Sequence, residues 1–167
     1  MPATYEPIAT YTFPSDAASY TFSAIPNTYT DLRLIIAETG TSGSNECALV
    51  FNGDTGANYD VVSLSAASDN TIGSGSAANE SRISFGGSIA SGVHIFEINN
   101  YKNTTTFKNC LSKSIGTGSG KNWLYFRCAN WRNTAAITSI TADTYGSAFG
   151  YLWRTGTTMT LYGIKAA

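Results

Sequence analysis

The chain carries little charge. Asp, Glu, Lys and Arg together make up 13% of its 167 residues, about half the share that is usual in a soluble domain. The formal net charge is −1, so no long-range field would attract nucleic acid or an anionic membrane surface. We therefore expect neither nucleic acid nor a membrane as a partner. A surface with few charges also costs little to desolvate against other protein.

Residues that favour helices are scarce as well. The chain has no glutamine, five glutamates and five lysines, whereas Thr (22), Ser (19), Gly (16) and Asn (13) together supply 70 residues. These four types favour turns and the exposed faces of strands over helix interiors. The composition therefore predicts an all-β protein. Its hydroxyl-rich surface suits sugar binding as well as packing against protein, so composition does not choose between the two.

Targeting and membrane-spanning segments are not evident. Residues 1–12 lack the basic and apolar regions of a signal peptide. No apolar run approaches the roughly 18 residues that a membrane span needs. We expect a soluble chain that is synthesised in the cytoplasm.

The three cysteines, Cys47, Cys110 and Cys128, are odd in number and are not spaced as metal ligands. Each lies within an apolar strand pattern, so we expect small buried side chains with reduced thiols. A Cys110–Cys128 disulfide is the alternative if those two strands are neighbours, although a reducing cytosol disfavours it.

Hydrophobic periodicity predicts about ten short strands and no helix. In the clearest one, Leu32, Leu34 and Ile36 alternate with Asp31 and Arg33, which is the period of a half-buried strand. We expect burial between two sheets for Leu32, Leu34, Ile36, Leu49 and Phe51. The predicted strands are 30–38, 47–51, 123–128 and 158–164, with further candidates at 8–13, 20–24, 59–64, 83–86, 94–99, 105–111 and 136–141.

Many short strands separated by turn residues predict one domain over residues 1–167, an antiparallel β-sandwich of the jelly-roll type. Residues 66–80 are rich in Ser, Ala, Gly and Asn, and we expect them to form a long functional or mobile loop. Pro2, Pro7 and Pro14 favour an extended N-terminal arm over residues 1–14 that reaches a neighbouring protein.

Catalytic motifs are almost absent from the sequence. His94 is the single histidine and lies in an apolar strand pattern, and no serine stands in a Gly-x-Ser-x-Gly elbow. We therefore interpret His94 as structural and expect no enzymatic activity. Residues 116–121 are superficially similar to a phosphate-binding loop, but Ile115 and Asn122 stand where that loop needs Gly and Ser or Thr. A flexible hairpin loop is the better interpretation, with no cofactor.

The acidic residues do not predict a metal site. Asp54 and Asp60 flank a glycine, but their spacing does not match a calcium-binding loop. Asn52 and Asp54 are instead expected to cap backbone groups of a turn. We expect no bound metal.

Aromatic residues are numerous: ten Tyr, eight Phe and three Trp. Most should fill the core and the others should lie at subunit contacts, where Tyr, Trp and Arg are enriched. A platform on which sugars stack is the alternative. The residues that we expect at an interface or ligand surface are Asn52, Asp54, Asn58, Tyr59, Trp131, Arg132, Tyr151, Trp153 and Arg154.

Five segments of the sequence resemble, in the same order, segments of a known group of proteins. They are Tyr5–Thr10, Ile25–Leu34, Phe51–Tyr59, Trp131–Ile140 and Thr160–Lys165. Together they resemble small virion structural proteins of tailed bacteriophages, especially phages of cyanobacteria and aquatic bacteria. The resemblance implies a β-sandwich associated with the capsid or tail and without enzymatic activity. Residues 66–92 and 142–153 match no pattern that we can name.

From these observations we predict a capsid decoration (cement) protein that stabilises the assembled shell. It would stand on the capsid surface of the virion, bound to the major capsid protein and to itself as a homotrimer, after synthesis in the bacterial host. The alternative is a receptor-binding module of a tail or head fibre that holds a host surface glycan. A fibre would more often show a long repetitive shaft before its tip, and this chain has none.

Overall fold

The computed structural model describes residues 5–40, 47–85, 91–144 and 152–165, and every regular element in them is a β-strand. The chain is thus all-β, as predicted. The strands are β1 (Tyr5–Thr12), β2 (Ser19–Phe22), β3 (Asp31–Glu38), β4 (Cys47–Phe51), β5 (Tyr59–Ala67), β6 (Ile72–Glu80), β7 (Ile83–Phe85), β8 (Ser91–Asn99), β9 (Lys108–Gly118), β10 (Lys121–Trp131), β11 (Ile140–Thr144) and β12 (Thr158–Ile164).

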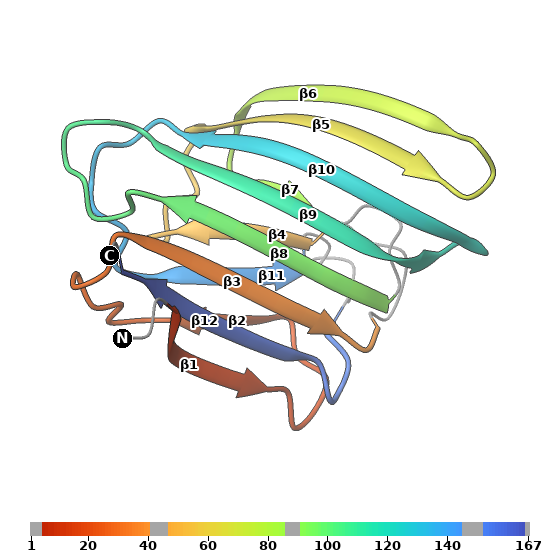
Figure 1. The fold of residues 1–167 in the computed structure, drawn as a ribbon, viewed down its shortest axis with the longest axis horizontal. Coiled ribbons are helices and arrows are strands. Elements are labelled where there is room, and N and C mark those ends of the chain that lie inside the picture. Colours follow the sequence, from red (N-terminus) through yellow and green to blue (C-terminus); the bar gives the residue numbers. More distant parts are fainter. Residues whose placement is uncertain (1–4, 41–46, 86–90, 145–151, 166–167) are drawn as a thin grey trace.

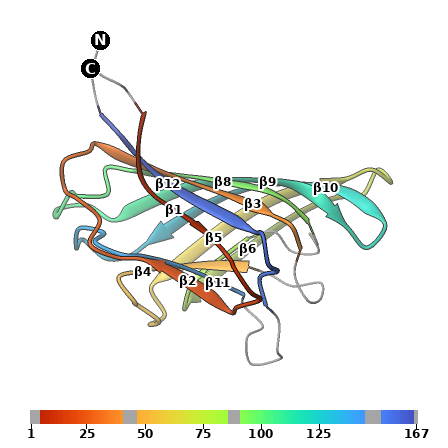
Figure 2. The ribbon, with the colours of Figure 1, turned by 90° about the horizontal axis from the view of Figure 1, so that it is seen from below.

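Two antiparallel sheets of unequal width form a sandwich (Figures 1 and 2). The large sheet has eight strands in the order β1-β12-β3-β8-β9-β10-β5-β6, and the small sheet has four in the order β2-β11-β4-β7. The two ends of the described chain lie together, because Tyr5 of β1 pairs with Ile164 of β12. In the large sheet, β9, β10, β5 and β6 continue the sheet on the side of β8 that faces away from β1, β12 and β3. We call these four the extended strands.

The hydrophobic core lies between the two sheets. Strand β3 alternates between buried and partly exposed residues, and β12 does the same in register beside it. This alternation places apolar side chains on the inner face, where their removal from water stabilises the fold. The five residues that the sequence assigned to the core are all fully buried, which confirms that prediction: Leu32, Leu34, Ile36, Leu49 and Phe51.

At residues 116–121 the structure has a β-hairpin between β9 and β10, where the sequence predicted a flexible glycine-rich loop. Strand β9 continues to Gly118 and β10 begins at Lys121, so the turn contains only Ser119 and Gly120. Both turn residues have positive φ, 53° and 74°, as a two-residue type I′ turn requires. The residues interpreted as a flexible loop are thus mostly ladder residues of a long hairpin.

The prediction of a long loop at residues 66–80 was wrong, because most of this segment belongs to strands β5 and β6. Residues 72–80 pair with β5 along their length and form an edge of the large sheet. In the turn before β6, Asp69 Oδ1 accepts a hydrogen bond from Thr71 N (3.1 Å) and Asn70 adopts a positive φ of 66°. Neither face of β6 is buried, so hydrophobic periodicity carries no signal for it.

The N-terminal segment is part of the sheet. Residues 5–12 pair with β12 as strand β1, so this part of the expected arm lies within the chain's own fold. Residues 1–4 lie outside the described residues. Several other boundaries also shift; the largest changes are that the strand expected at 105–111 begins at Lys108 and runs to Gly118, and the one expected at 136–141 is Ile140–Thr144.

The three cysteines differ in their exposure to solvent. Cys47 and Cys110 are buried, as expected, but Cys128 is exposed. Cys110 and Cys128 do lie on neighbouring strands, where Cys110 pairs with Ala129 and Cys128 pairs with Leu111. The two side chains therefore point to opposite faces of the sheet, because successive residues of a strand alternate. None of the three cysteines forms a disulfide.

Candidate functional site

The turn at residues 52–59 brings several predicted site residues together. The carboxylate of Asp54 accepts hydrogen bonds from Trp131 Nε1 (2.8 Å), Asn58 Nδ2 (2.9 Å) and Gly56 N (2.9 Å). Burial alone would raise the pKa of Asp54, but these hydrogen bonds stabilise the carboxylate and leave its pKa lowered. Asp54 therefore anchors the turn to β10, as a capping residue should.

Asn52 organises a neighbouring segment. Its side-chain Oδ1 accepts hydrogen bonds from Thr138 N (2.8 Å) and Ser139 N (3.1 Å), and its Nδ2 donates to Ala136 O (2.8 Å). These bonds, together with a backbone hydrogen bond from Asn52 N to Ser139 O (3.0 Å), hold the segment that precedes β11. Asn52 is thus a structural residue.

The predicted aromatic residues do not form a surface. Tyr59 and Trp131 are 0% and 1% exposed, and their rings are stacked within the core. Burial raises the pKa of Tyr59 to about 12, and its hydroxyl donates to Asp54 O (3.0 Å). Trp153 is also 0% exposed. We therefore correct the assignment of these three rings to an interface or ligand surface: they are core residues.

Two of the remaining predicted residues, Arg132 and Arg154, contact different partners. Arg132 donates to Asn79 Oδ1 (2.7 Å) and pairs with Asp60 (3.5 Å). Arg154 pairs with Asp16 (2.6 Å) and keeps half of its side chain exposed. Tyr151 lies outside the described residues. The structure does not bring these arginines to one site.

The outer face of the large sheet is the feature that the sequence did not single out. Ile115 of β9 lies directly between Val93 of β8 and Leu124 of β10 in the ladder, so all three point outward side by side. In the next row, Phe126 of β10 pairs with Leu64 of β5. We define the outer apolar face by its exposed large side chains, each at least 39% exposed: Val62, Leu64, Ile72, Val93, Ile115, Leu124 and Phe126.

The residues of this face come from five neighbouring strands of the large sheet, β8, β9, β10, β5 and β6, which lie side by side in Figure 1. Around Leu64, Leu124 and Phe126 it contains an apolar depression of about 330 Å³. Cys128 lies on the same face, paired across the strands with Leu111 and Val62. Exposed apolar side chains that gather on one face are a common feature of interaction surfaces.

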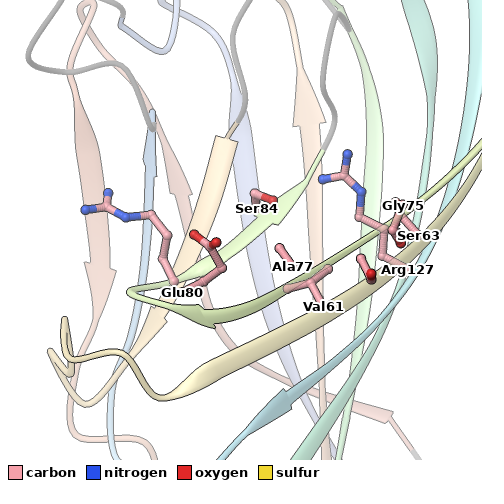
Figure 3. A pocket seen from close by; sticks show the side chains of 9 residues that line it. Val61, Ser63, Gly75, Ala77, Glu80, Ser84 and Arg127 are labelled. Atoms are coloured by element: carbon pink, nitrogen blue, oxygen red, sulfur yellow. Dashed lines mark hydrogen bonds between the residues drawn. The ribbon is translucent and has the colours of Figure 1, made fainter.

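A second surface is a polar pocket on the other side of the extended strands, bordered by β7 (Figure 3). Its volume is about 360 Å³. Figure 3 shows Glu80 and Ser84 toward one end and Ser63 and Arg127 toward the other, with Val61 and Ala77 between them. The pocket is therefore lined by hydroxyl groups, a carboxylate and the guanidinium groups of Arg82 and Arg127, which are of the kind that hydrogen-bond polar ligands.

His94 belongs to a buried pair. Its Nε2 lies 2.7 Å from Glu38 Oε2, and both side chains are completely buried. The ring of Phe85 packs edge-on against the imidazole at a centroid distance of 5.0 Å. This position between the sheets agrees with the structural interpretation of His94, since each group partners the other away from water.

Comparison with known proteins gives no family assignment: no protein-family profile matches the chain, and no curated protein matches it significantly. Within the described ranges, no three or more His, Cys, Asp or Glu side chains are grouped so that they could hold a metal ion. The part of the chain that the structure describes also contains no helix long and apolar enough to cross a membrane.

Proposed function

We propose that this chain is a structural protein of a tailed-phage virion, a capsid decoration (cement) protein that stabilises the assembled shell. The observation that carries the proposal is the outer apolar face, because an exposed apolar face of this breadth is typical of a surface that binds other protein. The five segments that resemble phage virion proteins supply the setting. The chain's few charges suit extensive protein contacts, since little charge must be desolvated.

We also propose that the sandwich is an extended jelly roll. Without β5, β6, β9 and β10, the two sheets have the orders β1-β12-β3-β8 and β2-β11-β4-β7. In each of them, early and late strands of the chain alternate, as two interleaved Greek keys require. Viral capsid domains and lectins commonly use this architecture. The two added hairpins, β5–β6 and β9–β10, then supply most of the outer apolar face.

A decoration protein of this kind stabilises a shell by mass action. It binds the assembled shell, through the major capsid protein, and does not bind dissociated subunits, so binding lowers the free energy of the assembled state. Contacts made by apolar and hydroxyl groups should also persist at high salt, because screening acts mainly on exposed charges.

The test is the copy number in purified virions, measured by gel densitometry against the major capsid protein. A decoration protein should be present in a fixed, high ratio to the capsid protein, whereas a tail component should be present in a few copies per particle. Particles made without the chain should lose their genome at lower temperature, and addition of the purified chain should restore their stability. A low copy number would contradict the proposal.

A second candidate function, binding of a host surface glycan, is favoured by the polar pocket. Its serines, Glu80 and Arg127 offer hydrogen-bonding groups of the kind that recognise sugar hydroxyls. Binding to an array of bacterial surface glycans tests it. A specific glycan whose binding is lost in Glu80→Gln and Ser84→Ala, but kept in Asp69→Ala at the remote hairpin tip, would favour this function over the first.

A further inference from the structure

We propose that the outer apolar face is covered by the same face of a second copy of this chain, so that two sandwiches pack sheet against sheet. The inference rests on the proposed function in one respect only, namely that this face binds protein. It adds the identity of the partner, and it concerns the chain in solution as well as on the virion.

The exposed area of the face is the first argument. Its seven defining side chains are between 39% and 83% exposed. With full areas of roughly 150–200 Å² per residue, these fractions leave roughly 580–770 Å² uncovered, which is at or above the upper end of the range for the largest apolar patch on a typical monomer. A stable interface buries about 800 Å² on each partner. A pair of these faces would therefore supply nearly the whole apolar area of a standard interface.

The second argument is complementarity of shape. Two sheets pack face to face when their twists match, with strands inclined by about 30° and the layers about 10 Å apart. The outer faces of two identical chains have the same twist by construction. The exposed side chains also stand in rows across neighbouring strands, Val93–Ile115–Leu124 in one row and Leu64–Phe126 in the next. Such rows can interdigitate with rows of the same spacing.

The third argument is the placement of charge. Three charged residues lie on this side of the sheet: Lys113, paired across the strands with Phe126, and Arg33 and Glu97, in the row that continues through Leu111 and Cys128 to Val62. The ammonium group of Lys113 lies 3.8 Å from Glu97, which also pairs with Arg33 (3.4 Å). The charges are thus drawn toward one another at one side of the face. The aliphatic stem of Lys113 can then remain against apolar surface while its charge stays solvated.

The geometry favours a pair over the trimer that we expected from the sequence. A single patch that contacts its own copy gives a closed two-fold dimer, whereas a three-fold ring needs two different patches in head-to-tail contact. The outer apolar face is one patch, so the same patch of a second copy can cover it. A two-fold pair is therefore the arrangement that we infer.

Light scattering coupled to size exclusion measures the number of copies. We expect two copies for the natural chain, and one copy for Leu124→Arg, which places a charge in the centre of the face. The matched control is Phe107→Arg, because Phe107 is 50% exposed and Leu124 47% exposed, but Phe107 precedes β9 and lies outside the face. It should remain a pair. Circular dichroism and a thermal melt verify that each variant is folded.

Cys128 provides a second readout that needs no substitution in the face. Cys128 is exposed in the single chain, while Cys47 and Cys110 are buried, and burial raises the pKa of the Cys110 thiol. A maleimide should therefore label mainly Cys128. We expect labelling to slow in proportion to the fraction of chains that are paired as concentration rises, and Leu124→Arg to abolish this dependence.

The outcomes separate this inference from the proposed function. A monomer at all concentrations, a trimer, or a dimer that Leu124→Arg leaves intact with Cys128 still reactive would each overturn the face-to-face pair. If such a result came with a high copy number in virions, the decoration function would stand and the shell itself would be the partner. If the pair formed but the copy number were low, the inference would stand and the function would fail.

Discussion

Replacement of Asp54 by alanine should destabilise the fold, because it leaves the buried indole N–H of Trp131 without its hydrogen-bond acceptor. Gly56 and Asn58, which donate to the Asp54 carboxylate, lie at the surface of the turn and can donate to water instead. Trp131 cannot, because it is 1% exposed. A buried donor that loses its acceptor costs about 1–3 kcal/mol, and a hydrogen bond to a charged group contributes about 1.5–3 kcal/mol. Both figures describe the loss of the same bond, so we expect a loss of about 1.5–3 kcal/mol.

Urea unfolding followed by tryptophan fluorescence measures this loss. The matched control is Asp69→Ala: Asp69 also accepts a hydrogen bond from the backbone two residues ahead, Thr71 N, but its other partner is Lys121 at the surface (2.5 Å). An exposed pair of this kind contributes about 1 kcal/mol at most. If Asp54→Ala cost no more than Asp69→Ala, the buried bond to Trp131 would not be what holds the turn.

The same carboxylate predicts a dependence on pH. Its pKa is lowered in the folded state, so the folded chain favours the deprotonated form more than the unfolded chain does. The stability that Asp54 contributes is therefore complete above its ordinary pKa of about 4, and it is lost as pH falls through the lower folded-state value. The acid limb of the stability curve should be shallower in Asp54→Ala than in the natural chain. Parallel limbs would contradict this reasoning.

Three further substitutions test the core. Leu34→Ala should cost about 2–5 kcal/mol in urea unfolding, as truncation of a fully buried leucine does, and a cost near zero would show that the assigned packing is wrong. His94→Ala leaves the buried Glu38 carboxyl group without its partner at 2.7 Å; we expect a loss of about 3–5 kcal/mol that the double variant with Glu38→Leu partly restores, and no restoration would argue against the pair. Gly163→Ala places a Cβ within 2.3 Å of the Tyr29 ring, so its melting temperature should fall by an amount corresponding to about 1–3 kcal/mol, and Tyr29→Ala should relieve the clash.

The fold was predictable wherever a strand has one buried face. Residues 31–38 and 158–164 alternate in sequence and are strands β3 and β12 in the structure. Strand β6 could not be recognised, because it is an edge strand with both faces exposed and is built from Gly, Ser, Ala and Asn. Its position is set by pairing with β5 and not by its own side chains. The unequal width of the two sheets followed from such pairings and was not predictable.

The candidate site was predictable only in its turn chemistry. The sequence identified Asp54 as a capping residue, and its hydrogen bonds confirm that. It placed Tyr59, Trp131 and Trp153 at a surface because aromatic residues are enriched at interfaces, but in this chain they fill the core. The signal for the outer apolar face was present in residues 123–126, where large apolar side chains follow one another without a polar alternate. Such runs are typical of strands that are covered on both faces.

The exposed apolar residues are best explained by assembly and not by folding. Of the large hydrophobic side chains that remain exposed, Leu64, Ile115, Leu124 and Phe126 lie on the extended strands, and none of them contributes to the core between the sheets. A side chain that stays in water gains little from folding, because hydrophobic stabilisation scales with the area removed from water. The free energy that these residues can supply is therefore still available when the chain has folded. Burial of the outer face against a partner would supply this free energy to binding. The inner faces of these strands therefore stabilise the fold, and their outer faces would stabilise the assembly.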